Sequence, residues 1–164
     1  MANYIGIDPS TKTGLVVMSD SGIVIYEQEI TTKEKRDPQR FINISDRLIS
    51  KVDFDDKVII EGFSYGSKGK GVSTQYGIGW TIRTALVEQG INYIEVSPNT
   101  LKKFATGKGN VKKEDMILPI YKRWNYENDS DNIRDAYVLA QIGRAIDGKG
   151  DFTKAQLDCL KGLG

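Results

Sequence analysis

Residues 4–30, YIGIDPSTKTGLVVMSDSGIVIYEQEI, decide the fold. The segment 4–8 reads as a short buried strand that ends on an acidic residue, and 14–19 and 23–30 read as two further strands. The Asp-Ser-Gly sequence at 20–22 is typical of a tight turn. Strands joined by such short connections are antiparallel neighbours, so this stretch predicts a three-stranded meander.

The rest of the chain alternates helical and strand patterns. Asp37 suits a helix N-cap and Pro38 the first helical position, and apolar residues then recur at helical spacing. Further strands are expected at 57–61 and 91–96, and further helices at about 73–89, from 97, after 110, and at about 132–146. The order predicts an α/β fold with a mixed five-stranded sheet, three antiparallel strands followed by parallel ones, and helices on both faces. We expect a single domain over residues 1–164, with a weakly patterned, loosely held tail after about residue 148.

Composition excludes several chemistries. The chain has 164 residues, no histidine and one cysteine, Cys159. Catalysis by imidazole, zinc bound by histidine, and an intrachain disulfide are therefore excluded. Any reactive groups must be carboxylates, lysines, tyrosines or hydroxyls, and carboxylates suit hard cations such as Mg²⁺.

The sequence also bears on localisation. It contains no run of 18 apolar residues, and its start, MANYIGID, lacks a basic segment followed by an apolar one. These features predict a cytoplasmic protein that makes no use of a membrane, or one of the host cytoplasm if a phage encodes it.

The net charge of +1 conceals an uneven distribution. Residues 1–63 carry a net −3, residues 64–113 a net +6, and residues 114–164 a net −2. A basic, glycine-rich centre between acidic ends favours a surface that binds a polyanion such as DNA. The alternative is a solvated lysine face. The candidate DNA-binding lysines are Lys68, Lys70, Lys102, Lys103, Lys108, Lys112 and Lys113.

Carboxylates stand where the predicted elements meet. Asp8 ends the first strand and Glu61 the fourth, and Asp135 lies near the start of the last helix. Asp131 precedes Asp135 by four residues and shares its face if the helix extends that far. Each taken alone has another explanation, as a cap or an ion-pair partner. Together, acidic residues at the ends of apolar strands favour a metal site, because a half-buried carboxylate needs a partner.

Such a cluster fits one reaction in particular. Two metal ions held by carboxylates form a common device for phosphodiester hydrolysis, and the device needs no histidine.

Four motifs in order resemble those of the RuvC-type Holliday junction resolvases, which have the ribonuclease H-like fold. They are YIGIDPSTKTG, VIIEGF, SPNTLKKFATGKGNVKKEDM and DNIRDAYVLA, and the resemblance spans residues 3 to about 146. The short chain and its TGKG segment look more like the phage branch of this family.

The resemblance implies a crossover junction endodeoxyribonuclease that acts as a homodimer on branched DNA and makes paired nicks. It implies that Asp8, Glu61 and Asp135 bind two Mg²⁺ ions, for which Mn²⁺ substitutes, and that Lys102 and Lys113 contact DNA or aid catalysis. The family usually has Asp or His three residues before the last Asp, where this chain has Asn132. Asp131 is therefore expected as the fourth metal ligand, ahead of Asn132. Ser10 stands where the family commonly has Gly.

The roles of two aromatic residues and of one helix remain open. Phe63 and Tyr65 follow the strand-end Glu and are expected either to stack on bases at a branch point or to pack over a helix. The second helix is the candidate dimer interface, although its glycines are equally explained by internal packing. The residues in question are Tyr76, Gly77, Gly79, Trp80 and Arg83.

Three alternatives compete with a dedicated junction resolvase. One is a broader nuclease for branched DNA and replication forks. Another, suggested by Asn132, is a junction-binding protein that has lost catalysis. The third is an actin-like nucleotide-binding protein, but that fold encloses its nucleotide between two domains, and the chain holds one. We therefore expect no nucleotide cofactor.

Overall fold

A computed structural model describes residues 2–163 and contains one five-stranded sheet. The strands are β1 (Tyr4–Asp8), β2 (Thr13–Met18), β3 (Val24–Ile30), β4 (Lys57–Glu61) and β5 (Tyr93–Val96). Their spatial order is β3-β2-β1-β4-β5, with β1, β2 and β3 antiparallel and β1, β4 and β5 parallel. The predicted mixed sheet is confirmed.

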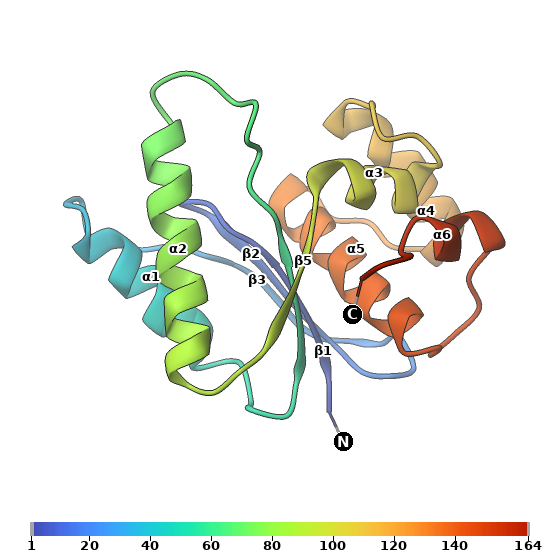
Figure 1. Ribbon diagram of the computed structural model, residues 1–164, viewed down its shortest axis with the longest axis horizontal. Coiled ribbons are helices and arrows are strands. Elements are labelled where there is room, and N and C mark those ends of the chain that lie inside the picture. Colours follow the sequence, from blue (N-terminus) through green and yellow to red (C-terminus); the bar gives the residue numbers. More distant parts are fainter. Residues whose placement is uncertain (1, 164) are drawn as a thin grey trace.

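Helices cover both faces of this sheet, as Figure 1 shows. One face carries α1 (Gln39–Ile49) and α2 (Val72–Glu88). The other carries α3 (Pro98–Thr106), the 3₁₀ turn η1 (Lys113–Met116), α4 (Ile117–Trp124), α5 (Asp131–Ile146) and α6 (Lys154–Asp158). No helix within residues 2–163 is long and apolar enough to cross a membrane.

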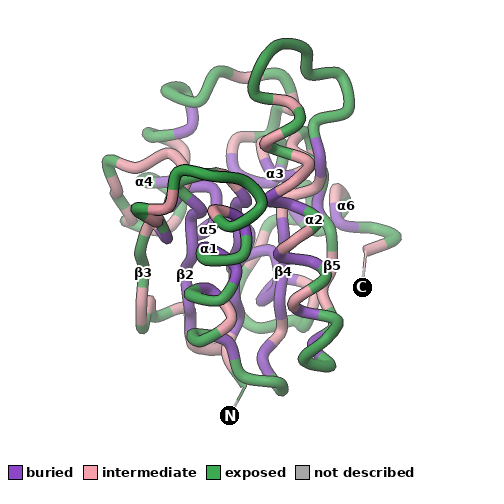
Figure 2. The backbone as a smooth tube through the Cα atoms, turned by 90° about the vertical axis from the view of Figure 1, so that its left-hand side faces the viewer, coloured by how far each residue is buried: buried purple, intermediate pink, exposed green. Residues whose placement is uncertain are grey.

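The central strands are buried on both faces, which explains their continuous apolar runs. Figure 2 shows them as a buried layer between the helices, with exposed loops at the rim. In β1, Ile5 and Ile7 pack toward α1 and α2, while Tyr4 packs toward α5. Gly6 gives α5 its close approach, because a Cβ atom there would lie 1.8 Å from the carbonyl oxygen of Ala136.

Two helix starts differ from the sequence prediction. In α1, Pro38 occupies the N-cap and Gln39 is the first helical residue, because the Asp37 carboxylate pairs with the Arg40 side chain at 2.7 Å instead of capping the helix. The helix expected after residue 110 is divided into η1 and α4. Pro119 falls in the first turn of α4, where a missing N–H breaks no helical hydrogen bond.

Within residues 149–163, the tail that was expected to be loosely held contacts the domain through α6 (Lys154–Asp158). Thr153 and Gln156 form a reciprocal capping box that starts α6. The buried Gln156 side chain also donates to the carbonyl of Phe104, and Leu160 is buried in the core. A capping box and one or two apolar anchors suffice to fix a short segment that has no long apolar periodicity.

Candidate active site

Three carboxylates meet at the edge of the sheet where β1 and β4 end. Asp8 is the last residue of β1 and Glu61 the last of β4, and these strands are parallel neighbours. Asp135 comes from α5, one turn after the helix begins, where the backbone lies against β1. One oxygen from each carboxylate lies within 4.8 Å of the other two, so the predicted convergence is confirmed as geometry.

Burial makes this cluster electrostatically costly. Desolvation, with the negative charges of Glu61 and Asp135, raises the pKa of Asp8 well above its ordinary value. Desolvation and the charge of Asp135 raise the pKa of Glu61 to about 7. Among residues 2–163, Asp8 Oδ2 and Glu61 Oε2 are buried without a hydrogen-bond partner. The folded chain thus holds acceptor oxygens together that it does not satisfy itself.

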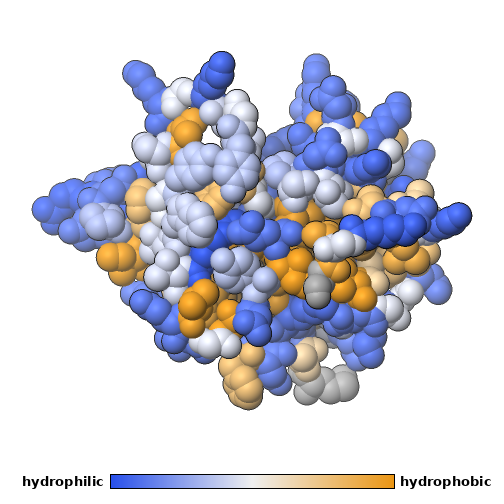
Figure 3. Space-filling model, in the orientation of Figure 1, coloured by the Kyte–Doolittle hydropathy of each residue, from blue (hydrophilic) through white to orange (hydrophobic). Residues whose placement is uncertain are grey.

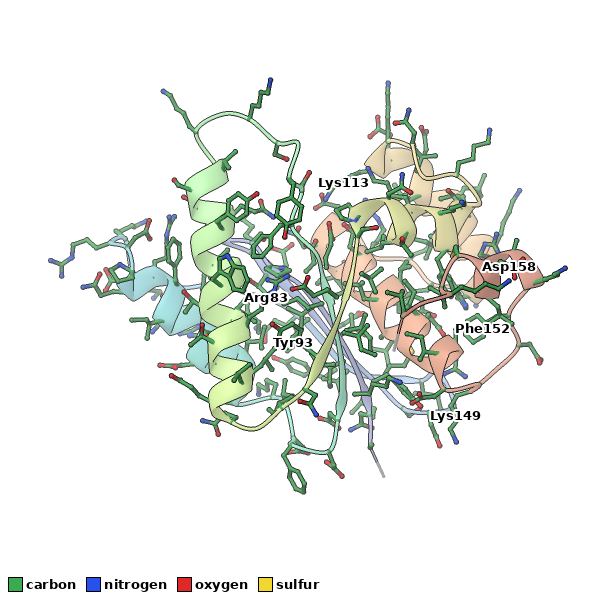
Figure 4. The ribbon with its side chains drawn as sticks, viewed as in Figure 1. Arg83, Tyr93, Lys113, Lys149, Phe152 and Asp158 are labelled. Atoms are coloured by element: carbon green, nitrogen blue, oxygen red, sulfur yellow. The ribbon has the colours of Figure 1, made fainter. Side chains whose placement is uncertain are left out.

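Lys113 supplies one positive charge at the rim of the cluster (Figure 4). Its Nζ atom lies 2.9 Å from Asp131 and 3.4 Å from Asp135. Burial would lower the pKa of this ammonium group, but the carboxylates of Asp135 and Asp131 outweigh burial and raise it. The bond from Lys113 lowers the pKa of Asp131. Asp131 therefore lies outside the three-carboxylate cluster as the partner of Lys113, and its role as a metal ligand stays a prediction.

The cluster fits a divalent metal ion. Its donors are carboxylate oxygens, which hard cations such as Mg²⁺ and Mn²⁺ prefer. A single ammonium group balances only part of the charge of three carboxylates, and the two unpartnered oxygens of Asp8 and Glu61 are free to bind an ion. Asp8, Glu61 and Asp135 are the residues that would hold it.

Exposed lysines occupy the loops on either side of the cluster. The β4–α2 loop (62–71) carries Lys68 and Lys70, and the α3–η1 loop (107–112) carries Lys108 and Lys112. Figure 3 shows the loops as separate projections with hydrophilic tips and a notch between them.

The neighbouring α3 lysines differ from one another. The positive charge of Lys102 is close enough to lower the pKa of Glu61, whereas Lys103 acts on Cys159, near the C-terminus. Lys103 therefore lies on a different side of α3 from the cluster, although it belongs to the predicted DNA-binding set.

The two candidate aromatic residues have different environments. Phe63 is only 7% exposed, and its ring packs against Tyr76, with ring centroids 4.9 Å apart, and against the guanidinium of Arg83. This position favours packing over base stacking for Phe63. Tyr65 is 77% exposed on the β4–α2 loop, and its ring meets the Phe63 ring edge-on, with centroids 6.1 Å apart, so most of the ring faces solvent. Ser64, Ser67 and Lys68 line a hollow of about 160 Å³ beside it.

The glycines of α2 are explained by packing within the chain. A Cβ atom at Gly77 would lie 2.3 Å from the Phe41 ring, and one at Gly79 would lie 2.4 Å from the Phe63 ring. Arg83 is buried as well, so of the candidate interface residues Trp80 is the exposed one, at 54%. It borders a shallow groove between α1 and α2, together with Ile42 and Thr84.

Two residues that the sequence did not indicate as part of the site also lie beside the cluster. Arg83 and Gln75, both from α2, line the same small hollow as Asp8 and Glu61. Gln75 donates to the carbonyl of Pro9 at 3.4 Å. The sequence offered one signal for Arg83: it is a charged residue beside the apolar row Ile78, Ile82 and Leu86, the face that α2 buries against the sheet.

The strand order and directions of this sheet are those of the ribonuclease H-like fold, and solved structures show the same fold. The chain superposes on the structure of Thermus thermophilus RuvC with a TM-score of 0.70 and 17% identity, covering 91% of this chain and 98% of that one. T. thermophilus RuvC in complex with a Holliday junction substrate gives the same TM-score and identity, with 93% and 100% covered. The fold is therefore that of RuvC.

A sequence comparison also finds similarity to a RuvC protein. The chain is 36% identical over 73 residues to the crossover junction endodeoxyribonuclease RuvC of Chlamydia muridarum. The match covers 42% of this chain and 43% of that protein, so it spans less than half of the relative's length. No protein-family model matches the chain. The resemblance to RuvC-type resolvases seen in the sequence motifs is thus found again in both sequence and fold.

Proposed function

We propose that this protein is a metal-dependent endonuclease that cleaves the phosphodiester backbone of branched DNA and resolves four-way junctions. The observation that carries the proposal is the buried Asp8–Glu61–Asp135 cluster, with unpartnered oxygens, between two lysine-bearing loops. RuvC of T. thermophilus has the same fold and has been solved with a Holliday junction substrate. On this basis we also place the protein in the cytoplasm, where DNA is processed.

In the proposed mechanism Asp8, Glu61 and Asp135 hold two Mg²⁺ ions, and Mn²⁺ substitutes for them. When bound, such ions lower the pKa of the attacking water and stabilise the charge on the leaving oxygen. The chain itself orients the cluster through β1, β4 and α5 and excludes bulk water by burial. Lys113, bonded to Asp131 and Asp135, places a positive charge where a scissile phosphate approaches.

Two roles for Asp131 are consistent with this mechanism. It either serves as a fourth ligand once Lys113 turns to the phosphate, or it only holds Lys113 in place. The salt bridge of 2.9 Å between Lys113 and Asp131 supports the second role.

DNA would lie in the notch between the two loops. Lys68 and Lys70 on one side and Lys108, Lys112 and Lys102 on the other would bind phosphates, which fixes the position of the backbone without reading sequence. Tyr65 would stack on a base left unpaired at the branch point, a contact worth about 1–3 kcal/mol.

We further propose a homodimer, because a four-way junction presents two equivalent strands and a two-fold dimer presents two equivalent sites. The groove between α1 and α2, with the exposed Trp80 and Ile42 beside it, is the surface on this chain that supports the proposal. Thr84→Arg would place a charge in the groove. Sedimentation velocity should then show a monomer where the unaltered chain is a dimer.

The decisive experiment compares three labelled DNA molecules: a four-way junction, a replication fork and a linear duplex. Each is incubated with the protein and Mg²⁺, Mn²⁺ or EDTA. We expect paired, symmetric nicks in the junction with either metal and none with EDTA. Asp8→Asn should bind the junction and leave it uncut.

Other outcomes of this experiment are equally informative. Cleavage of forks as well as junctions would mean a broader branched-DNA nuclease. Tight junction binding without cleavage in any divalent ion would mean a binding protein that has lost catalysis. Cleavage by Asp8→Asn at the unaltered rate would contradict the assignment of the site.

A further inference from the structure

Arg83 is the largest fully buried side chain within residues 2–163, with 1% of its surface exposed. An arginine in this position is costly, because taking a charge out of water is repaid only when every donor finds a partner. An apolar residue of similar volume would fill the space between α2 and the sheet at lower cost. The contacts of the guanidinium group therefore indicate what the charge does.

These contacts tie three elements together. Nε donates to Glu95 on β5 at 2.6 Å, and Nη1 donates to the carbonyl of Gly79 one turn back on α2 at 2.9 Å. Nη2 donates to the backbone carbonyl of Glu61 at 3.2 Å. Figure 4 shows Arg83 in the layer between α2 and the sheet, close to Tyr93.

The peptide that follows Glu61 is held on both sides. Its carbonyl accepts from Arg83, and its N–H, which belongs to Gly62, donates to the carbonyl of Val96 at 2.7 Å. This peptide lies at the end of β4, where the last bond of the β4–β5 ladder holds its N–H side and the Arg83 side chain holds its carbonyl side. Without Arg83, the carbonyl side of the peptide loses that donor and gains freedom to rotate.

Arg83 also holds the next residue after that peptide. Its guanidinium carbon lies 4.1 Å from the ring centroid of Phe63, in cation–π geometry. The rigid, planar guanidinium group of Arg83 thus contacts both the backbone of Glu61 and the ring of Phe63. Arg83 lines the same hollow as the Asp8 and Glu61 carboxylates.

We infer that Arg83, anchored by Glu95, is a positioning residue that fixes the Glu61 carboxylate for metal binding. The inference rests on the proposed function of the cluster. It acts through the backbone, since the guanidinium bonds to the Glu61 carbonyl and not to its carboxylate. Partners that orient metal ligands typically change metal affinity by about 10–100-fold when they are removed, and we expect a change of this order for Arg83 although it acts through the backbone.

The test measures Mn²⁺ binding by calorimetric titration and thermal unfolding, with no DNA present. In Arg83→Met, an apolar side chain of similar length fills the space, and we expect the Mn²⁺ dissociation constant to rise about 10–100-fold. Glu95→Gln keeps a hydrogen-bond acceptor but removes the charge that anchors Arg83, so its effect should be in the same direction and smaller.

Arg144 on α5 provides a matched control. It is 8% exposed, donates to the carbonyl of Asp20 at 2.9 Å, and stands 6.0 Å from the Phe152 ring, so its environment parallels that of Arg83 away from the cluster. Arg144→Met should lower the unfolding temperature and leave the Mn²⁺ dissociation constant unchanged.

The outcomes separate this inference from the proposed function. An Mn²⁺ dissociation constant in Arg83→Met equal to that of the unaltered chain, or an equal loss in Arg144→Met, would overturn it. If Arg83→Met does not fold, Glu95→Gln decides the question by the same comparison. If the unaltered chain binds no Mn²⁺ and cuts no junction, the proposed function fails instead.

Discussion

Asp8 serves two opposing demands. Desolvation and the neighbouring charges of Glu61 and Asp135 disfavour the anionic form of Asp8 and raise its pKa. For the same reason, a charged Asp8 lowers the stability of the fold when no metal is bound. As a candidate metal ligand, it must be charged. Function and stability at this residue therefore pull in opposite directions until a cation arrives.

Asp8→Asn should accordingly stabilise the metal-free protein while abolishing cleavage. The amide has nearly the same shape, carries no charge and donates hydrogen bonds to the two remaining carboxylates. We expect a gain of about 1–2 kcal/mol, which raises the unfolding temperature in EDTA by several degrees. The exposed Asp151→Asn, between α5 and α6, is the control and should change neither quantity. A lower unfolding temperature for Asp8→Asn in EDTA would contradict this account of the cluster.

Glu61 predicts a pH dependence of stability. Its pKa is raised from 4.5 to about 7 in the folded chain, so the folded state binds this proton more tightly than the unfolded state. Below about pH 4.5 both states are protonated. As pH rises from there to about 7 the unfolded state loses its proton first, and the free energy of unfolding falls by on the order of 1–3 kcal/mol.

Urea denaturation in EDTA between pH 5 and 8 measures this effect. Glu61→Gln should show a flatter profile, because the titrating group is gone. Saturating Mg²⁺ should reduce the fall in the unaltered chain, since the ion binds the deprotonated carboxylates. A profile for Glu61→Gln as steep as that of the unaltered chain would assign the pH dependence to other groups.

At the scale of elements, the site depends on how closely α5 lies on β1. Asp8 and Asp135 come from these two elements, and Gly6 on β1 and Gly14 on the neighbouring β2 set how closely α5 approaches the sheet. A Cβ atom would lie 1.8 Å from the Ala136 carbonyl oxygen at Gly6 and 2.0 Å from the Asn132 carbonyl oxygen at Gly14. Both contacts are with backbone, which cannot move aside as a flexible side chain would.

Gly6→Ala should therefore push α5 away from the sheet. We expect a loss of about 1–3 kcal/mol in unfolding free energy, the range of an overpacked core, together with weaker Mn²⁺ binding because Asp135 moves with the helix. Gly66→Ala, on the β4–α2 loop, meets nothing within 4 Å and is the control, with little change expected in either quantity. Normal metal affinity in a destabilised Gly6→Ala would show that the cluster tolerates a shift of α5.

The same packing explains what could be predicted from the sequence. Strand-end positions, short apolar runs and helix periodicity are local, so the sheet and the meeting of Asp8, Glu61 and Asp135 were predicted and are confirmed. Side-chain partners depend on tertiary contacts. The burial of Phe63, the pairing of Asp131 with Lys113 and the contacts of Arg83 had no local signal that distinguished them from their alternatives. Weak periodicity likewise hid the docking of the tail through Gln156.

At the scale of the whole molecule, charge is arranged around the notch. The net charge of +1 hides a basic segment of +6 over residues 64–113, and the structure places four of its seven lysines on the β4–α2 and α3–η1 loops. The buried cluster between them is acidic. A polyanion is therefore attracted by the two loops, and its phosphate meets the cluster only with the help of a cation and Lys113.

This arrangement predicts which lysines set the salt dependence of DNA binding. Lys70→Ala with Lys108→Ala removes one lysine from each loop, and the log–log slope of junction affinity against salt should become shallower by about 1 for each lost phosphate contact. Lys103→Ala with Lys149→Ala removes equal charge elsewhere, since Lys103 faces Cys159 and Lys149 lies at the opposite edge of the molecule (Figure 4). The slope should then stay unchanged. Measuring both pairs in the Asp8→Asn background keeps the junction uncut, and equal slopes for the two pairs would place DNA outside the notch.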